Sequence, residues 1–162
     1  MFSRAEMAER LGGFVYGTIV VLSVIVAGAK AYPDDTTRIA VLVAGTTIVF
    51  WLAHAYAHAL AQSVRSNEHL TVAEVRRIGR HEAALVQAGL PSIAVLLLGS
   101  LGLFDSDTAI WLAVGFGLAV LAVQGFVFAR VEGLGRTATI AVVAVNLALG
   151  LLLVALKLVV TH

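Results

Sequence analysis

The chain alternates between long apolar runs and short polar segments. A helix needs about 20 mostly apolar residues to cross the hydrocarbon core of a bilayer, and five runs reach this length. We therefore predict an all-α polytopic membrane protein with five transmembrane helices in a single domain. The predicted helices cover residues 11–29, 38–62, 84–104, 108–129 and 139–160.

The connection between the second and third runs is the only long one, and it carries a helix signal of its own. Thr71 and Glu74 have the spacing of a capping box, which marks the start of a helix. Three apolar residues then recur at helical spacing among three arginines: Val72, Val75 and Ile78 with Arg76, Arg77 and Arg80. This pattern predicts an amphipathic helix over about residues 71–83, lying at the membrane surface.

The third run contains two residues that disturb a helix, Gly89 and Pro91. Proline lacks a backbone donor, and its ring clashes with the preceding turn. We therefore expect the third crossing to be kinked near these residues.

Composition supports the membrane assignment and excludes several other classes. Hydrophobic residues make up 60% of the chain, charged residues 13%, and the mean hydropathy is +0.96; a soluble domain carries about 25% charged residues. The absence of cysteine excludes disulfides and thiolate chemistry. A net charge of +1 without a basic run argues against nucleic acid as a partner. Hydrolase, phosphate-loop and dinucleotide motifs are absent, so we do not expect an enzyme.

The distribution of Lys and Arg predicts the orientation. One side of the membrane would hold Arg4, Arg10, Arg65, Arg76, Arg77, Arg80, Arg130 and Arg136, and the other Lys30, Arg38 and Lys157. Because basic residues mark the cytoplasmic side, we place the N-terminus inside and the C-terminus outside a bacterial plasma membrane. We expect no cleavable signal peptide, because the first apolar run exceeds a signal core of about 7–15 residues.

The second run ends in WLAHAYAHALAQ, which places two histidines in a membrane helix. Residues four apart share one helix face. One stripe therefore combines Thr47, Trp51, His54, His58, Gln62 and Arg65. Polar groups in lipid are costly, so the stripe should face protein or a water-filled cavity.

Polar residues of the other helices fall at similar depths. Measured along the helices, they lie mostly in the cytoplasmic half of the membrane, whereas the outer half is nearly all apolar. The predicted polar layer consists of Tyr16, His54, His58, Gln87, Gln124 and Asn146. An apolar outer half argues against a continuous channel and suits a pocket open to the cytoplasm.

The histidines admit three interpretations. Their polar neighbours could satisfy them as interhelical hydrogen bonds that fix packing. Two imidazoles four residues apart could instead bind a divalent metal such as zinc, with Glu82 as a third ligand. Alternatively, histidine titrates near pH 6.5, so the pair could carry protons or respond to pH.

One segment resembles a known family. ERLGGFVYGTIVVLSVIVAGA, with Tyr16 followed by Gly17, resembles the first helix of the vacuolar-iron-transporter family. That family has five crossings and an enlarged cytoplasmic segment between the second and third, and it exports divalent metal against protons as a dimer. Here the matching segment is shorter and lacks glutamate-rich helices, and residues 18–21 contain no acid. The whole chain, biased toward Ala, Val, Leu and Arg, resembles small five-helix membrane proteins of high-GC bacteria.

Together these patterns predict a small transporter or channel-like protein for a cation, either a proton or a divalent metal, acting through His54 and His58. Five helices form a thin bundle, so a transport path would need a homodimer or larger assembly. The alternative is a membrane scaffold, sensor, or lipid- or partner-binding protein whose polar layer is structural.

Overall fold

The computed structural model describes residues 4–66 and 71–160, and side chains over residues 10–65 and 71–155. Within these residues the regular secondary structure is all helical, without strands, and turns connect the helices. Four helices are long and apolar enough to cross a membrane. They are α1 (Arg4–Ala31), α2 (Thr36–Ser66), α6 (Ser106–Val131) and α7 (Arg136–Val160). Each contains one of the predicted apolar runs and extends beyond it at one end or both.

The remaining predicted crossing, residues 84–104, is broken into two shorter helices, α4 (Ala83–Gln87) and α5 (Leu90–Ser100). They are preceded by α3 (Val72–His81), which lies within the segment predicted as an amphipathic helix. The segment Val72–Gln87 meets α5 at a bend of 50°. If this bent pair is one span, the helices that could cross a membrane number five.

The bend lies where Gly89 and Pro91 predicted a kink. Gly89 precedes α5, and Pro91 occupies its first turn, where the missing backbone donor costs nothing. A Cβ at Gly89 would lie 3.2 Å from Val21 Cγ2 and 3.4 Å from Thr47 Cγ2. The glycine therefore lets the bend approach α1 and α2 closely, and the predicted kink is confirmed.

The predicted end of this crossing was wrong. We expected a helix to residue 104, but α5 ends at Ser100 and residues 101–104 form an exposed turn. Gly102 has a φ of +80°, a conformation that glycine adopts without strain. Because three of the four residues in this turn are apolar, the apolar run in the sequence is longer than the helix.

The capping box that opens α3 is confirmed. Thr71 Oγ1 accepts a hydrogen bond from the Glu74 backbone N–H at 3.3 Å, and Glu74 Oε2 accepts one from the Thr71 backbone N–H at 2.8 Å. Thr71 Oγ1 also lies 2.8 Å from Glu74 Oε2 and donates to it. These contacts fix the start of α3 at Val72 and so position the residues that follow.

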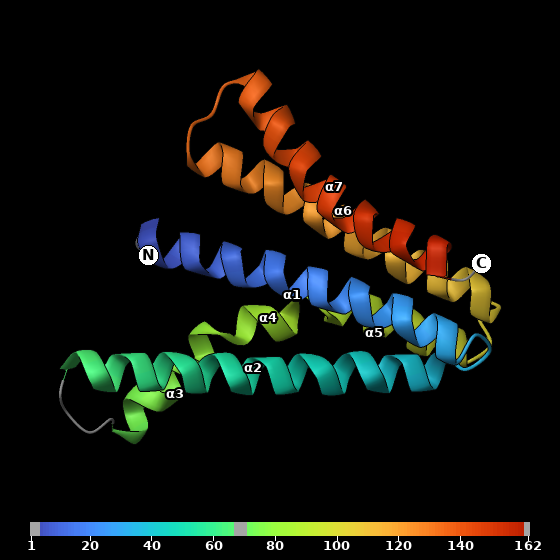
Figure 1. Ribbon diagram of the computed structural model, residues 1–162, viewed down its shortest axis with the longest axis horizontal. Helices are drawn as coiled ribbons and strands as arrows, with labels where there is room; N and C mark the ends of the chain where they lie inside the picture. The colour runs from blue at the N-terminus through green and yellow to red at the C-terminus, as the bar shows by residue number, and fades with distance from the viewer. Residues whose placement is uncertain (1–3, 67–70, 161–162) are drawn as a thin grey trace.

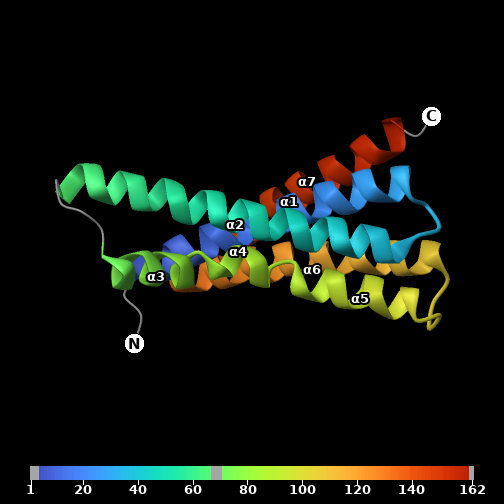
Figure 2. The ribbon, with the colours of Figure 1, turned by 90° about the horizontal axis from the view of Figure 1, so that it is seen from below.

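Helix α1 lies in the middle of the bundle, packed against α2, α4, α6 and α7 (Figures 1 and 2). The N-terminus and the α2–α3 and α6–α7 connections lie at one end of the molecule (Figure 1), which we call the basic end because it holds Arg65, Arg76, Arg77, Arg80, Arg130 and Arg136. The C-terminus and the α1–α2 and α5–α6 connections lie at the other end.

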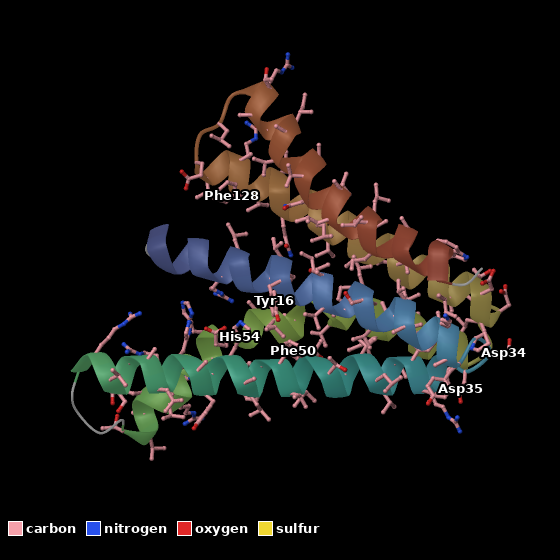
Figure 3. The ribbon with its side chains drawn as sticks, in the orientation of Figure 1. Tyr16, Asp34, Asp35, Phe50, His54 and Phe128 are labelled. Carbon is pink, nitrogen blue, oxygen red and sulfur yellow. The ribbon has the colours of Figure 1, made fainter. Side chains whose placement is uncertain are left out.

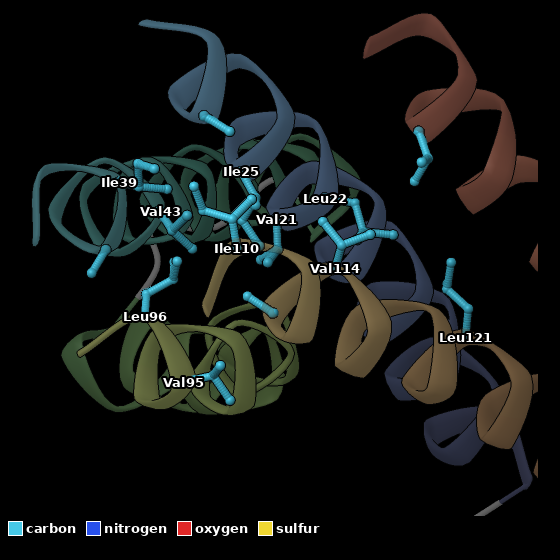
Figure 4. Close-up of a cluster of buried hydrophobic side chains, with 14 residues drawn as sticks. Val21, Leu22, Ile25, Ile39, Val43, Val95, Leu96, Ile110, Val114 and Leu121 are labelled. Atoms are coloured by element: carbon cyan, nitrogen blue, oxygen red, sulfur yellow. The ribbon is translucent and has the colours of Figure 1, made fainter. Parts of the chain in front are cut away.

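The apolar core occupies the half of the bundle away from the basic end. Figure 4 shows side chains from α1, α2, α5 and α6 meeting there. Its fully buried members include Val21, Leu22, Ile25, Ile39, Val43, Leu96 and Leu121. The polar contacts described next lie nearer the basic end.

Candidate functional site

Two residues of the α2 stripe, Thr47 and Trp51, face protein, whereas His58 and Arg65 of the same stripe are exposed. Trp51 Nε1 donates to the backbone oxygen of Gly79 on α3 at 2.8 Å. Thr47 is buried, and its hydroxyl donates within α2 to Val43 O and Ala44 O, both at 2.9 Å. The part of the stripe at Thr47 and Trp51 is therefore packed against neighbouring helices.

His58 and Glu82 form the central contact of the candidate site. His58 Nδ1 lies 2.6 Å from Glu82 Oε1. The side chain of Glu82 is only 8% exposed, whereas that of His58 is 55% exposed. A buried carboxylate thus has one partner that is itself accessible from outside the bundle.

Glu82 reaches this position because α3 and α4 are separate helices. It ends α3, with its backbone N–H bonded to Ile78 O, and it directly precedes α4. Its side chain caps neither helix. The carboxylate therefore makes no capping hydrogen bond to the backbone and can bind the imidazole of His58 on α2.

The contact pairs a ring nitrogen with a carboxylate oxygen. A carboxylate oxygen only accepts, so His58 Nδ1–H is the donor to Glu82 Oε1 in this 2.6 Å contact. With Nδ1 protonated, Nε2 of a neutral His58 carries the lone pair that can take a second proton. Proton binding at Nε2 would convert the contact into an ion pair with Glu82.

His54 has different neighbours. Its ring lies against Tyr16 of α1, with the ring centroids 5.2 Å apart at 41° (Figure 3). Tyr16 also lies 6.1 Å from Phe50, at 54°. His54 thus belongs to an aromatic contact between α1 and α2, one turn away from the His58–Glu82 pair.

The three predicted metal ligands do not assemble into one group. In the described part of the chain, no group of three or more His, Asp or Glu side chains is placed to hold a metal ion. His58 and Glu82 are together, but His54 does not complete a three-ligand site with them. A structural zinc site takes four protein ligands and a catalytic one takes three.

The rest of the predicted polar layer is dispersed. Gln87 is exposed on α4. Asn146 of α7 donates from Nδ2 to Leu121 O of α6 at 3.3 Å. Gln124 is 6% exposed, and neither its Oε1 nor its Nε2 has a hydrogen-bond partner among the residues that the structure describes. The layer therefore contains separate contacts along different helix pairs rather than one cluster.

Sequence reasoning missed the contribution of Gly79. Its carbonyl accepts from Trp51, and a Cβ at this position would lie 3.4 Å from Trp51 Cζ2. In the sequence, this contact is indicated only by a single glycine among the arginines of the amphipathic pattern. Because Gly79 has no side chain, the indole of Trp51 can approach the α3 backbone.

The fold is that of a helical protein whose long apolar helices suit a membrane. Comparisons with protein-family models, with curated proteins and with solved structures found no significant match.

Proposed function

We propose that the chain is a five-span protein of the bacterial plasma membrane that binds and releases a proton at His58 and Glu82, as the cytoplasmic step of small-cation transport. The observation that carries this proposal is the 2.6 Å contact between a half-exposed imidazole and a buried carboxylate. Ionisable groups inside membrane segments are costly and mark ion paths and proton relays.

The orientation rests on the basic end. Arginines of the α2–α3 and α6–α7 connections gather there, and basic residues mark the cytoplasmic side. The N-terminus would then be cytoplasmic and α3 would lie at the inner membrane surface. His58 would exchange protons with the cytoplasm.

A proton fits the site better than a divalent metal. Two facing groups, His58 Nδ1 and Glu82 Oε1, suffice to bind and relay a proton. A metal would need further ligands, and the described residues offer no group of three.

The packed core sets a condition on transport. Side chains including Leu22, Ile25, Ile39 and Val43 fill the half of the bundle away from the basic end. A proton that enters at His58 therefore needs helix movement or a path between subunits to leave on the other side. We accordingly propose a homodimer or larger assembly as the working unit.

A structural scaffold is the second candidate, and specific contacts favour it. Hydrogen bonds that link helices without involving the pair include Trp51 Nε1 to Gly79 O, Ser92 Oγ to Ala113 O at 3.0 Å, and Asn146 Nδ2 to Leu121 O. Such bonds contribute about 0.6 kcal/mol each and fix packing. In this case the His58–Glu82 contact would be one more of them.

Proton flux into liposomes separates the two candidates. The protein is reconstituted with a pH-sensitive dye inside, and a potassium gradient with valinomycin drives proton entry. We expect Glu82→Gln and His58→Gln to slow dye acidification at least tenfold, because each removes one member of the relay. The matched control is Glu132→Gln, an exposed acid at the end of α6, which should leave the flux unchanged.

Two outcomes would overturn the proposal. If wild-type liposomes acidify no faster than protein-free liposomes, the chain does not conduct protons. If all three variants match the wild type, the pair is not the path and the scaffold is favoured.

A further inference from the structure

The outward side of α3 combines two adjoining surfaces. Val72 is 85% exposed and Val75 is 47% exposed. At 100° per residue they lie beside Ile78, which is buried against the bundle. The neighbouring arc carries Arg76, Arg77 and Arg80, all exposed.

The three arginines are available to a partner. In the part of the chain that the structure describes, salt bridges join Arg38 to Asp35 and His58 to Glu82, and none involves α3 arginines. Glu74 is the single acid of α3; its carboxylate is bonded to Thr71 at the first turn, and these bonds, together with the charge of Arg77, lower the pKa of this carboxyl. The surface thus carries three arginines against one acid, a net positive arc next to an apolar edge.

We propose that α3 binds the anionic phospholipid headgroups of the inner leaflet through Arg76, Arg77 and Arg80, while Val72 and Val75 enter the acyl boundary. Guanidinium groups bind phosphate oxygens bidentately, and an adjoining apolar edge distinguishes a lipid from a free phosphate. The inference rests on the membrane placement proposed above but does not depend on proton transport.

Headgroup binding to α3 should affect the contacts that α3 and the following residue make with α2. Gly79 lies between Arg77 and Arg80 in the sequence, and its carbonyl accepts from Trp51 at 2.8 Å. Glu82 follows two residues after Arg80 and contacts His58. Anionic lipid that holds α3 in place should therefore also hold the Trp51–Gly79 contact.

Trp51 provides the readout. The chain has two tryptophans, so Trp111→Phe leaves Trp51 as the single emitter. The protein is placed in nanodiscs of phosphatidylcholine alone or with increasing phosphatidylglycerol, and acrylamide quenching of Trp51 is measured. The comparison uses Arg76→Gln/Arg80→Gln and the matched control Arg130→Gln/Arg136→Gln, which removes the same charge at the same end.

We expect phosphatidylglycerol to reduce quenching of Trp51 in the parent and in the Arg130/Arg136 control. In Arg76→Gln/Arg80→Gln the lipid concentration for half the effect should rise on the order of fivefold per arginine removed, about 25-fold in all. Native mass spectrometry should show fewer retained phosphatidylglycerol molecules on this variant alone. The variant should fold, because both arginines are exposed.

Three results would overturn the inference. Quenching could be independent of phosphatidylglycerol in the parent, or both double variants could respond alike, which would indicate general surface charge. Glycerol 3-phosphate added to phosphatidylcholine nanodiscs could reproduce the effect, which would assign the arginines to a soluble anion. A loss of proton flux in Glu82→Gln with the lipid response intact would separate the two proposals.

Discussion

Individual side chains in the basic half of the bundle differ sharply in how their polar atoms are satisfied. Glu82 is buried but has His58 as a partner at 2.6 Å. Asn146 donates a hydrogen bond to the backbone carbonyl of Leu121. Gln124 is buried, and within the described part of the chain neither its amide oxygen nor its amide nitrogen is hydrogen-bonded. An unsatisfied buried polar group costs about 1–3 kcal/mol, so these residues should contribute to stability with different signs.

Gln124→Leu should therefore stabilise the protein, by about 1–3 kcal/mol, because an apolar side chain of similar volume removes the unsatisfied amide. The thermal midpoint in detergent reports the change. Asn146→Leu is the matched control and should lower the midpoint, since it removes the bond to Leu121 O. A lower midpoint for Gln124→Leu would show that this amide has a polar partner in the folded protein.

At the same scale, the sequence predicted the polar stripe of α2 but not its contacts. The i, i+4 spacing of His54 and His58 suffices to place both on one face. Which partner each meets depends on α1 for His54 and on the α3–α4 junction for His58, 24 residues along the chain from it. Such pairings arise from tertiary packing, which periodicity does not encode.

At the scale of elements, glycines decide how closely helices approach. A Cβ at Gly17 would lie 2.8 Å from the Leu85 backbone oxygen and 3.0 Å from Leu85 Cα. Backbone cannot move aside as a side chain can. By contrast, a Cβ at Gly13 would meet no atom of the described residues within 4 Å.

Gly17→Ala should destabilise the protein by about 1–3 kcal/mol, because α1 and α4 must separate. Gly13→Ala should be neutral or stabilising by up to about 1 kcal/mol, since alanine favours the helix. Thermal midpoints of the two variants, measured side by side, check the difference. Equal effects would contradict the close α1–α4 packing.

The start of α6 carries a pH-dependent cap. Asp105 accepts from the Thr108 backbone N–H at 2.9 Å and from its hydroxyl at 2.7 Å, and these bonds hold the pKa of its carboxyl below the ordinary range. A depressed folded-state pKa gives stability that is present above the unfolded pKa, near 4, and is lost as the pH falls through the folded one.

Asp105→Ala should accordingly lower the thermal midpoint at pH 7, and this difference from wild type should shrink at pH 3. Asp107→Ala is the control, because the neighbouring acid is exposed and makes no cap. A difference that stays constant between the two pH values would argue against the cap.

Element positions followed closely from apolar runs, helix caps and glycine or proline breaks. The α3 capping box and the bend at Gly89 were both foreseen. The end of α5 was not, because residues 101–104 are mostly apolar although they form a turn. A run of apolar residues indicates that a segment can lie in lipid. It does not determine the residue at which the helix ends.

At the scale of the whole molecule, the bundle divides into two halves. Apolar packing fills the half that ends in the α1–α2 and α5–α6 connections, whereas the Trp51–Gly79 and His58–Glu82 contacts lie toward the basic end with its six arginines. We propose that this division serves proton exchange and lipid binding at the basic end. The division depends on α3 and α4 folding back so that Glu82 reaches His58.

The most direct test of this account is the ¹⁵N spectrum of the histidines with the protein in lipid bilayers, with His58 assigned by its loss in His58→Gln. We predict that Nδ1 of His58 carries a strongly hydrogen-bonded proton in the wild type and that Glu82→Gln shifts this signal toward a weakly bonded imidazole, while Glu132→Gln leaves it unchanged. A His58 signal that is the same in the wild type and in Glu82→Gln would contradict the pair and with it the proposed proton site.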